Sequence, residues 1–204
     1  MNKCVVLILA AAVIFNVWGS GNAATIGFDD IVGMIGPWHQ GQPVPAKYMI
    51  DDEYLSQGVL FKTRGGGLRV ARTGNSISSP NMVAGTGPGP VLDYYAPVYA
   101  NFWEGPTPAV VDMAGLTLSN TSRSGSLAAY DLNGSVLGSV SGGASATLSL
   151  TFPGQIRSVI FYPRNAVFDN FTFDGLCAVP IPGAVWLLGS GLFGIIGIRR
   201  KPKQ

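Results

Sequence analysis

The chain has 204 residues, and its 13 Lys and Arg against 11 Asp and Glu give a formal net charge of +2. Five of the 13 cationic side chains lie at the two ends, so residues 24–198 carry eight cationic and eleven acidic side chains, a net charge of −3. This distribution argues against a nucleic-acid-binding surface. A single histidine and two cysteines exclude the His and Cys clusters of zinc sites.

The first 24 residues have the layout of a secretory signal peptide. Lys3 supplies the positive start, residues 5–15 are uninterruptedly apolar, and small residues fill positions 19–24. We therefore expect export across the inner membrane with removal of the leader after Ala23 or Ala24. Because Cys4 leaves with the leader, Cys177 has no partner for an intrachain disulfide.

Residues 25–176 are predicted to form one all-β domain, an antiparallel jelly-roll sandwich. Short segments of alternating polar and apolar residues recur between turn signals, and Asn133-Gly134 is the strongest hairpin signal because both residues tolerate positive φ. Around nine strands at this spacing indicate a sandwich. The expected strands cover residues 25–28, 58–63, 68–72, 115–118, 127–131, 135–140, 147–152, 156–162 and 167–173. Residues 31–57 and 74–108 are expected to be rich in loops.

Four side chains with oxygen ligands suggest a structural calcium site, the one cofactor that the sequence indicates. Asp29 and Asp30 follow the first expected strand, and Asp169 and Asn170 lie in the last one. If the two terminal strands pair, the four side chains lie close together, and such oxygen atoms are the ligands that Ca²⁺ prefers. The alternative is that Asp29 and Asp30 end a strand and that Asp169 and Asn170 point outward between two phenylalanines.

An aromatic segment at residues 93–104 is the candidate for sugar binding. It places Tyr94, Tyr95 and Trp103 among Asp, Asn and Glu side chains. Aromatic rings suit the apolar faces of sugars, and the polar side chains can bond hydroxyl groups. The alternative is that these rings pack a long loop onto the sandwich. Catalysis has less support, because the chain contains neither a nucleophile-elbow pattern nor a phosphate-binding loop.

Residues 177–204 form a tail with three parts. Val179, Pro180, Ile181 and Pro182 precede an uncharged apolar run at 183–198, and a basic stop follows at Arg199, Arg200, Lys201 and Lys203. As a helix the run measures roughly 24 Å, and with the preceding apolar residues it can cross the hydrocarbon core. Cations next to a span resist translocation, so they should stay in the cytoplasm. A buried core helix is the alternative.

The tail resembles the PEP-CTERM sorting signal of Gram-negative bacteria, in the variant that reads Val-Pro-hydrophobic-Pro. Ile181 stands where the family's name-giving motif has Glu. The resemblance implies recognition and cleavage by an exosortase, a membrane cysteine transpeptidase, and an association with exopolysaccharide and biofilm. The blocks between Phe28 and Phe173 also resemble the jelly-roll, galactose-binding-like ectodomains that accompany this signal.

We therefore expect an exported, non-enzymatic surface or matrix protein with a structural or adhesive role. The C-terminal helix would first hold it in the membrane, before it reaches the cell envelope, the outer surface or the medium. Its expected partners are an exosortase-type transpeptidase, the export machinery, the membrane and extracellular polysaccharide. The alternatives are a lectin-like carbohydrate-binding module and a secreted glycoside hydrolase, which needs two carboxylates in one cleft.

Overall fold

The computed structural model describes residues 23–34, 39–72, 81–89, 91–120 and 122–179. Their regular structure consists of β-strands and two short 3-10 helices, η1 (Ala46–Tyr48) and η2 (Leu55–Gln57). The all-β prediction is confirmed, and every expected strand overlaps an observed one. Residues 1–22 of the predicted signal peptide and residues 180–204 of the predicted tail lie outside the described residues.

A first sheet has the strand order β2-β4-β5-β14-β9-β12, with antiparallel neighbours. β1 continues the sheet beside β14, and β15 pairs with the start of β9. Its strands are β1 (Ala24–Ile26), β2 (Met49–Ile50), β4 (Leu68–Arg72), β5 (Asn81–Ala84), β9 (Thr107–Leu118), β12 (Thr147–Ile156), β14 (Phe168–Asp174) and β15 (Cys177–Ala178). The pairing of β1 with β14 confirms the expectation that the first predicted strand, at 25–28, and the last one, at 167–173, are neighbours.

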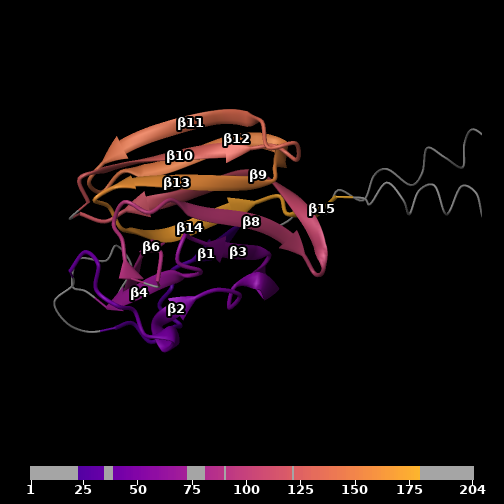
Figure 1. Cartoon of the computed structure of the whole chain (residues 1–204). Coiled ribbons are helices and arrows are strands. Elements are labelled where there is room, and N and C mark those ends of the chain that lie inside the picture. The colour runs from indigo at the N-terminus through magenta and orange to yellow at the C-terminus, as the bar shows by residue number, and fades with distance from the viewer. Residues whose placement is uncertain (1–22, 35–38, 73–80, 90, 121, 180–204) are drawn as a thin grey trace, which may run out of the picture.

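A second sheet has the order β3-β8-β13-β10-β11, again antiparallel. Its strands are β3 (Val59–Lys62), β8 (Val98–Glu104), β10 (Ser124–Tyr130), β11 (Val136–Gly143) and β13 (Ser158–Arg164). In Figure 1, β11, β10, β13 and β8 follow one another down the molecule. A separate two-stranded ribbon joins β6 (Thr86–Gly87) to β7 (Val91–Leu92).

The β8–β9 hairpin connects the two sheets. Trp103 pairs with Pro108 and Glu104 pairs with Thr107, and Gly105 at φ +57° makes the turn between them. Farther from the turn the strands separate, because β8 joins β13 in the second sheet and β9 joins β14 in the first. The hairpin projects at one end of the sandwich, next to β15 (Figure 1).

The core between the sheets is largely aromatic. The Phe171 ring from the first sheet meets the Phe61 ring from the second edge-on, with the centroids 5.1 Å apart. Such ring pairs contribute about 0.5–1.5 kcal/mol each beyond the area they bury. The buried phenylalanines are Phe28, Phe61, Phe102, Phe161, Phe168, Phe171 and Phe173.

Residues 74–108, which the sequence predicts to be rich in loops, contain a regular strand at residues 98–104, inside the second sheet. Val98, Ala100 and Phe102 are buried and alternate with more exposed residues, as a half-buried strand requires. The neighbouring aromatic and polar residues made this segment resemble a binding loop.

The described residues contain no helix that is long and apolar enough to cross a bilayer. The expected span at 183–198 and its basic stop at 199–203 lie outside the described residues.

Candidate functional site

The outer face of the second sheet carries a group of tyrosines. Because side chains alternate along a strand, the burial of Ala100 and Phe102 directs Tyr99 and Asn101 of β8 to the opposite, outer face. Tyr99 is 37% exposed, which is high for an aromatic side chain in a central strand.

The adjacent strands β13 and β10 add two more tyrosines to this face. Val159 and Phe161 of β13 are buried in the core, so Tyr162 points outward and is 39% exposed. On β10, Ala129 faces the core and Tyr130 faces outward. The tyrosines of three neighbouring strands therefore share one surface.

Tyr130 and Tyr162 lie along the sheet rather than standing away from it. The backbone of Tyr130 pairs with that of Ser158, four residues before Tyr162, which separates the two tyrosines by roughly 14 Å along the strands. Their hydroxyl oxygens are nevertheless only 3.0 Å apart. Ala128, which lies between them on the outer face, is only 6% exposed. We conclude that the two side chains reach toward each other along the sheet, on either side of Ala128.

Tyr99 belongs to the same group. It pairs with Ile160, so it is the diagonal neighbour of Tyr162 on the outer face, a position within reach of long side chains. The hydrogen bond with Tyr130, partial burial and the proximity of Tyr130 and Tyr99 raise the pKa of Tyr162 to about 12. The Tyr162 ring is therefore neutral at physiological pH. We call Tyr99, Tyr130 and Tyr162 the tyrosine face.

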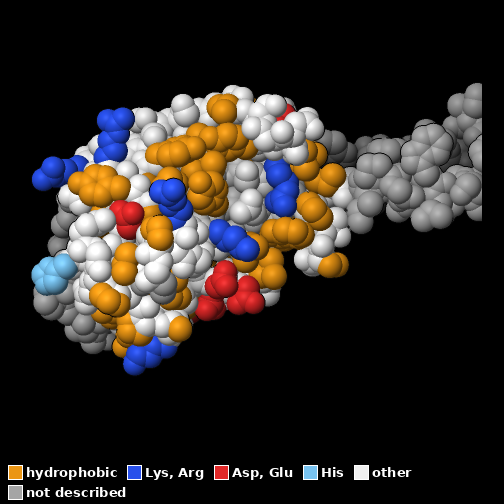
Figure 2. Space-filling model, viewed as in Figure 1, with side chains coloured by type: hydrophobic (Ala, Val, Ile, Leu, Met, Phe, Trp, Pro, Cys, Tyr) orange, Lys and Arg blue, Asp and Glu red, His pale blue; other side chains and the backbone are white. Residues whose placement is uncertain are grey.

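Polar and cationic side chains surround the tyrosine face. Asn101 and Ser158 are paired with each other beside Tyr130, and Ser126 is paired with Tyr162. Figure 2 shows hydrophobic side chains gathered over β10, β13 and β8, with Lys and Arg side chains at the border of the patch. The exposed cations next to the tyrosines are Lys62, paired with Tyr99, and Arg164, two residues after Tyr162.

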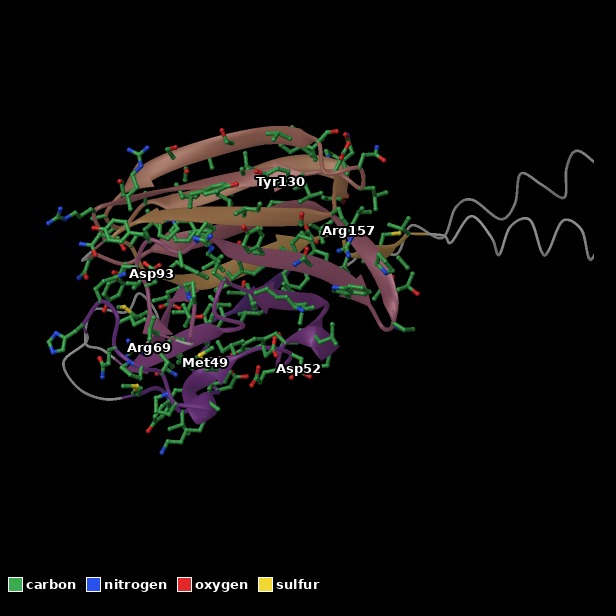
Figure 3. All side chains as sticks on the ribbon, in the orientation of Figure 1. Met49, Asp52, Arg69, Asp93, Tyr130 and Arg157 are labelled. Carbon is green, nitrogen blue, oxygen red and sulfur yellow. The ribbon has the colours of Figure 1, made fainter. Side chains whose placement is uncertain are left out.

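Trp103 occupies the end of β8 nearest the β8–β9 hairpin. The Arg157 guanidinium lies over its ring, 5.0 Å from the centroid, and also donates to the carbonyl of Phe102. Burial lowers the pKa of Arg157. Figure 3 shows Arg157 toward the hairpin end and Tyr130 on β10. Arg157 therefore covers one face of the indole ring.

The sugar-contact residues predicted from sequence are spread over both ends of β8. Tyr94 is half-buried, packs against the small core cluster around Leu92 and Met82, and is hydrogen-bonded with Arg69. Tyr95 is exposed in the turn before β8, and Trp103 lies near the other end of that strand. The structure does not bring the three rings onto one surface.

Asp29 and Asp30 accept hydrogen bonds from the protein. The Asp29 carboxylate accepts the backbone N–H of Asn81 at 2.9 Å, and the Asp30 carboxylate accepts the Tyr54 hydroxyl at 2.5 Å. The Asp30 hydrogen bond and burial both raise the pKa of Tyr54, with burial the larger cause. These two carboxylates hold the segment after β1 to β5 and to the loop before β3.

Asp169 and Asn170 form a bulge in β14. Asn170 has φ +48° and the register with β9 shifts at this point, so Phe168 and Phe171 both face the core although they are three residues apart. Asp169 is fully buried, and its carboxylate accepts the Asn170 N–H at 2.7 Å.

The described part of the chain brings no three His, Cys, Asp or Glu side chains close enough to hold a metal ion. Asp29, Asp30 and Asp169 are thus not gathered into a ligand set. Calcium binding by these three carboxylates together with Asn170 stays a prediction. Equal melting temperatures of the protein in chelator and in millimolar calcium would contradict it.

The last described residues run along the β8–β9 hairpin. The Ala178 N–H donates to the Glu104 carboxylate at 2.6 Å, and the Val179 N–H donates to the Pro108 carbonyl at 2.9 Å. Cys177 is exposed. Val179, the first residue of the predicted sorting motif, therefore lies beside the β8–β9 hairpin, and Pro180, Ile181 and Pro182 lie outside the described residues.

Comparison with known proteins assigns no family. No family model matches the chain, and no curated protein matches it. One similar solved structure is the CBM22-1 xylan-binding domain of Xyn10C from Paenibacillus barcinonensis, with 14% identity over 79% of this chain and 98% of that one, at a TM-score of 0.34. Another is the enzymatically active domain of tailspike protein 4 of bacteriophage CBA120, with 12% identity over 65% of this chain and 21% of that one, at a TM-score of 0.29. Similarity at this level assigns no ligand to this chain.

Proposed function

We propose that this chain is a non-enzymatic sandwich of the jelly-roll type that binds a carbohydrate polymer on the tyrosine face. The observation that supports this function is the grouping of Tyr99, Tyr130 and Tyr162 on the outer side of three adjacent strands. An exposed apolar patch with a polar border often marks a site of interaction on a protein surface. The C–H faces of sugar rings are suitable partners for flat aromatic rings.

The surroundings of the rings fit a sugar better than a purely apolar ligand. Asn101, Ser126 and Ser158 are half-buried beside the tyrosines and offer both donors and acceptors. The tyrosine hydroxyls add further hydrogen-bonding groups. Because all of these side chains come from paired strands, their relative positions are fixed before a ligand arrives, which lowers the entropic cost of binding.

The shape of the face favours a polymer over a small molecule. Small ligands are usually enclosed in concave pockets that bury most of their surface. The tyrosine face instead extends for roughly 14 Å along the strands between Tyr130 and Tyr162. That length exceeds a single sugar ring, so several consecutive sugars can contact the rings at once.

The test is affinity electrophoresis of the full chain through gels that contain neutral xylan or a polyuronate such as alginate. We expect a polysaccharide to retard the wild-type protein and the double variant Tyr99→Ala/Tyr162→Ala to bind on the order of tenfold more weakly, because removal of a central aromatic contact usually costs about 1 kcal/mol or more. Tyr48→Ala, which removes a tyrosine from η1, is the matched control. Equal retardation of wild type and double variant would refute the proposal.

We further propose that the chain is exported and sorted through its tail, and that it acts as an adhesive or structural component at the cell surface. The tail's motif, apolar run and basic stop support this proposal, as does the position of Val179, the first residue of the motif, beside the β8–β9 hairpin at one end of the sandwich. Intact-mass spectrometry of protein recovered from its native envelope and medium tests it. A mass that ends near residues 180–182 is expected, and a mass that extends to Gln204 would contradict cleavage.

A further inference from the structure

The outer face of the second sheet differs in charge from the rest of the domain. Residues 24–198 have a net charge of −3. The strands β3, β8, β10, β11 and β13, which are described in full, contain a single acidic residue, Glu104, and its carboxylate accepts the Ala178 N–H at the hairpin. The same strands contribute the exposed cations Lys62 and Arg164.

These cations lie at the two ends of a diagonal row that contains two of the tyrosines. Lys62 is the cross-strand partner of Tyr99, Tyr99 is the diagonal neighbour of Tyr162, and Arg164 follows Tyr162 on the same face of β13. The row thus runs cation, ring, ring, cation across three strands. Two strand spacings and four residues of rise separate Lys62 from Arg164 by roughly 17 Å.

We infer that the polymer bound by this face is an anionic polysaccharide whose sugar rings carry carboxylates, as in polyuronates. This inference rests on the function proposed above and names its ligand class. The rings of Tyr99 and Tyr162 stack on consecutive sugars, while Lys62 and Arg164 pair with carboxylates at either end. A span of roughly 17 Å requires an oligosaccharide rather than one sugar to reach both cations.

The charges and the rings make different contributions to binding. Exposed ion pairs are individually weak and are screened by salt, with a Debye length of about 8 Å at physiological ionic strength. Contacts between tyrosine rings and sugars depend much less on salt. Binding of a polyuronate should therefore weaken as salt is added, but it should persist at a level set by the rings.

The experiment compares polygalacturonate with its methyl ester, which keeps the sugar backbone and removes the charge, by calorimetry on the full chain. We expect the wild type to bind polygalacturonate more tightly than the ester, and added salt to reduce that preference. The variant Lys62→Gln/Arg164→Gln should bind polygalacturonate on the order of fivefold more weakly, because two exposed ion pairs are lost. It should bind the ester as the wild type does. Lys47→Gln, on η1, is the matched control for an exposed lysine.

The outcomes separate this inference from the proposed function. If Tyr99→Ala/Tyr162→Ala loses binding while Lys62→Gln/Arg164→Gln does not, the face binds sugar and the preference for anions is wrong. Equal wild-type affinity for acid and ester, or no binding of either polygalacturonate or alginate, also overturns the inference. If the tyrosine variant keeps full affinity for every polysaccharide that binds, the proposed function itself fails.

Discussion

The hydroxyl pair of Tyr130 and Tyr162 determines how the tyrosine face is presented. Without that contact, at 3.0 Å, either side chain could rotate away from the sheet and expose Ala128. The contact also changes the acidity of the phenol, because the hydrogen bond with Tyr130 is the largest cause of the raised pKa of Tyr162. A single pair of side chains thus sets both the geometry and the protonation of the face.

Replacing Tyr130 with Phe should lower the pKa of Tyr162 from about 12 toward 10, because the hydrogen bond that stabilises the protonated phenol is removed. In the wild type the proton is held more tightly in the folded chain than in the unfolded one. The stability from this pair is therefore complete below pH 10 and declines as the pH rises toward 12. Titration of tyrosinate absorbance in wild type, Tyr130→Phe and Tyr162→Phe measures the shift, and an unchanged Tyr162 midpoint in Tyr130→Phe would contradict this account.

At the scale of single elements, β10 contributes to the tyrosine face on its outer side and to the core on its inner side. On the inner side, Gly125 lies next to the Phe161 ring of the neighbouring strand β13. A Cβ at position 125 would collide with that ring. The outer side of β10 carries Tyr130 and Ala128. A glycine in the interior of a strand normally weakens it, and here the absent side chain leaves room for the phenylalanine.

The variant Gly125→Ala should lower the free energy of unfolding by about 1–3 kcal/mol, as overpacking in a filled core does. Gly143→Ala is the matched control, because an added Cβ in β11 would meet only the Arg123 carbonyl at 3.7 Å. Denaturant unfolding of both variants measures the difference. A Gly125→Ala protein as stable as Gly143→Ala would show that Phe161 can move without cost.

The alternation of polar and apolar residues, together with the turn signals, predicted the strands in which buried and exposed side chains alternate. Asn133-Gly134 was identified as a hairpin, and the observed β10–β11 turn has Gly134 at φ +79° with the Asp131 carboxylate accepting N–H groups of Asn133 and Ser135. The bulge at Asn170 could not be predicted, because a left-handed residue inside a strand breaks the alternation on which the prediction relies.

At the scale of the whole molecule, β15 and the tyrosine face lie on different parts of the sandwich. β15, which opens the predicted tail, and the β8–β9 hairpin lie at one end of the sandwich (Figure 1). The tyrosine face lies on the outer side of the second sheet. The tyrosine face and the end that carries β15 therefore do not overlap.

The candidate site was only partly accessible from the sequence. The aromatic segment at 93–104 contains Tyr99, but the sugar contacts predicted from it are Tyr94, Tyr95 and Trp103. The two other tyrosines of the face, Tyr130 and Tyr162, are far away in the chain and meet Tyr99 only because β8, β13 and β10 are neighbours. The alternation of buried and exposed residues shows from the sequence that each of these tyrosines points outward from its strand. The order of the strands, which places the three tyrosines on one surface, is visible only in the structure.

The most direct test of the central claim is chemical modification of tyrosines in the full chain, with and without a saturating polysaccharide, followed residue by residue by mass spectrometry. Tyr95, Tyr99 and Tyr162 are all exposed, so each should react in the free protein. If the outer face of the second sheet binds the polymer, the polysaccharide should slow the modification of Tyr99 and Tyr162 severalfold and leave Tyr95 unaffected. Protection of Tyr95 alone, or of none of the three at saturation, would contradict the account.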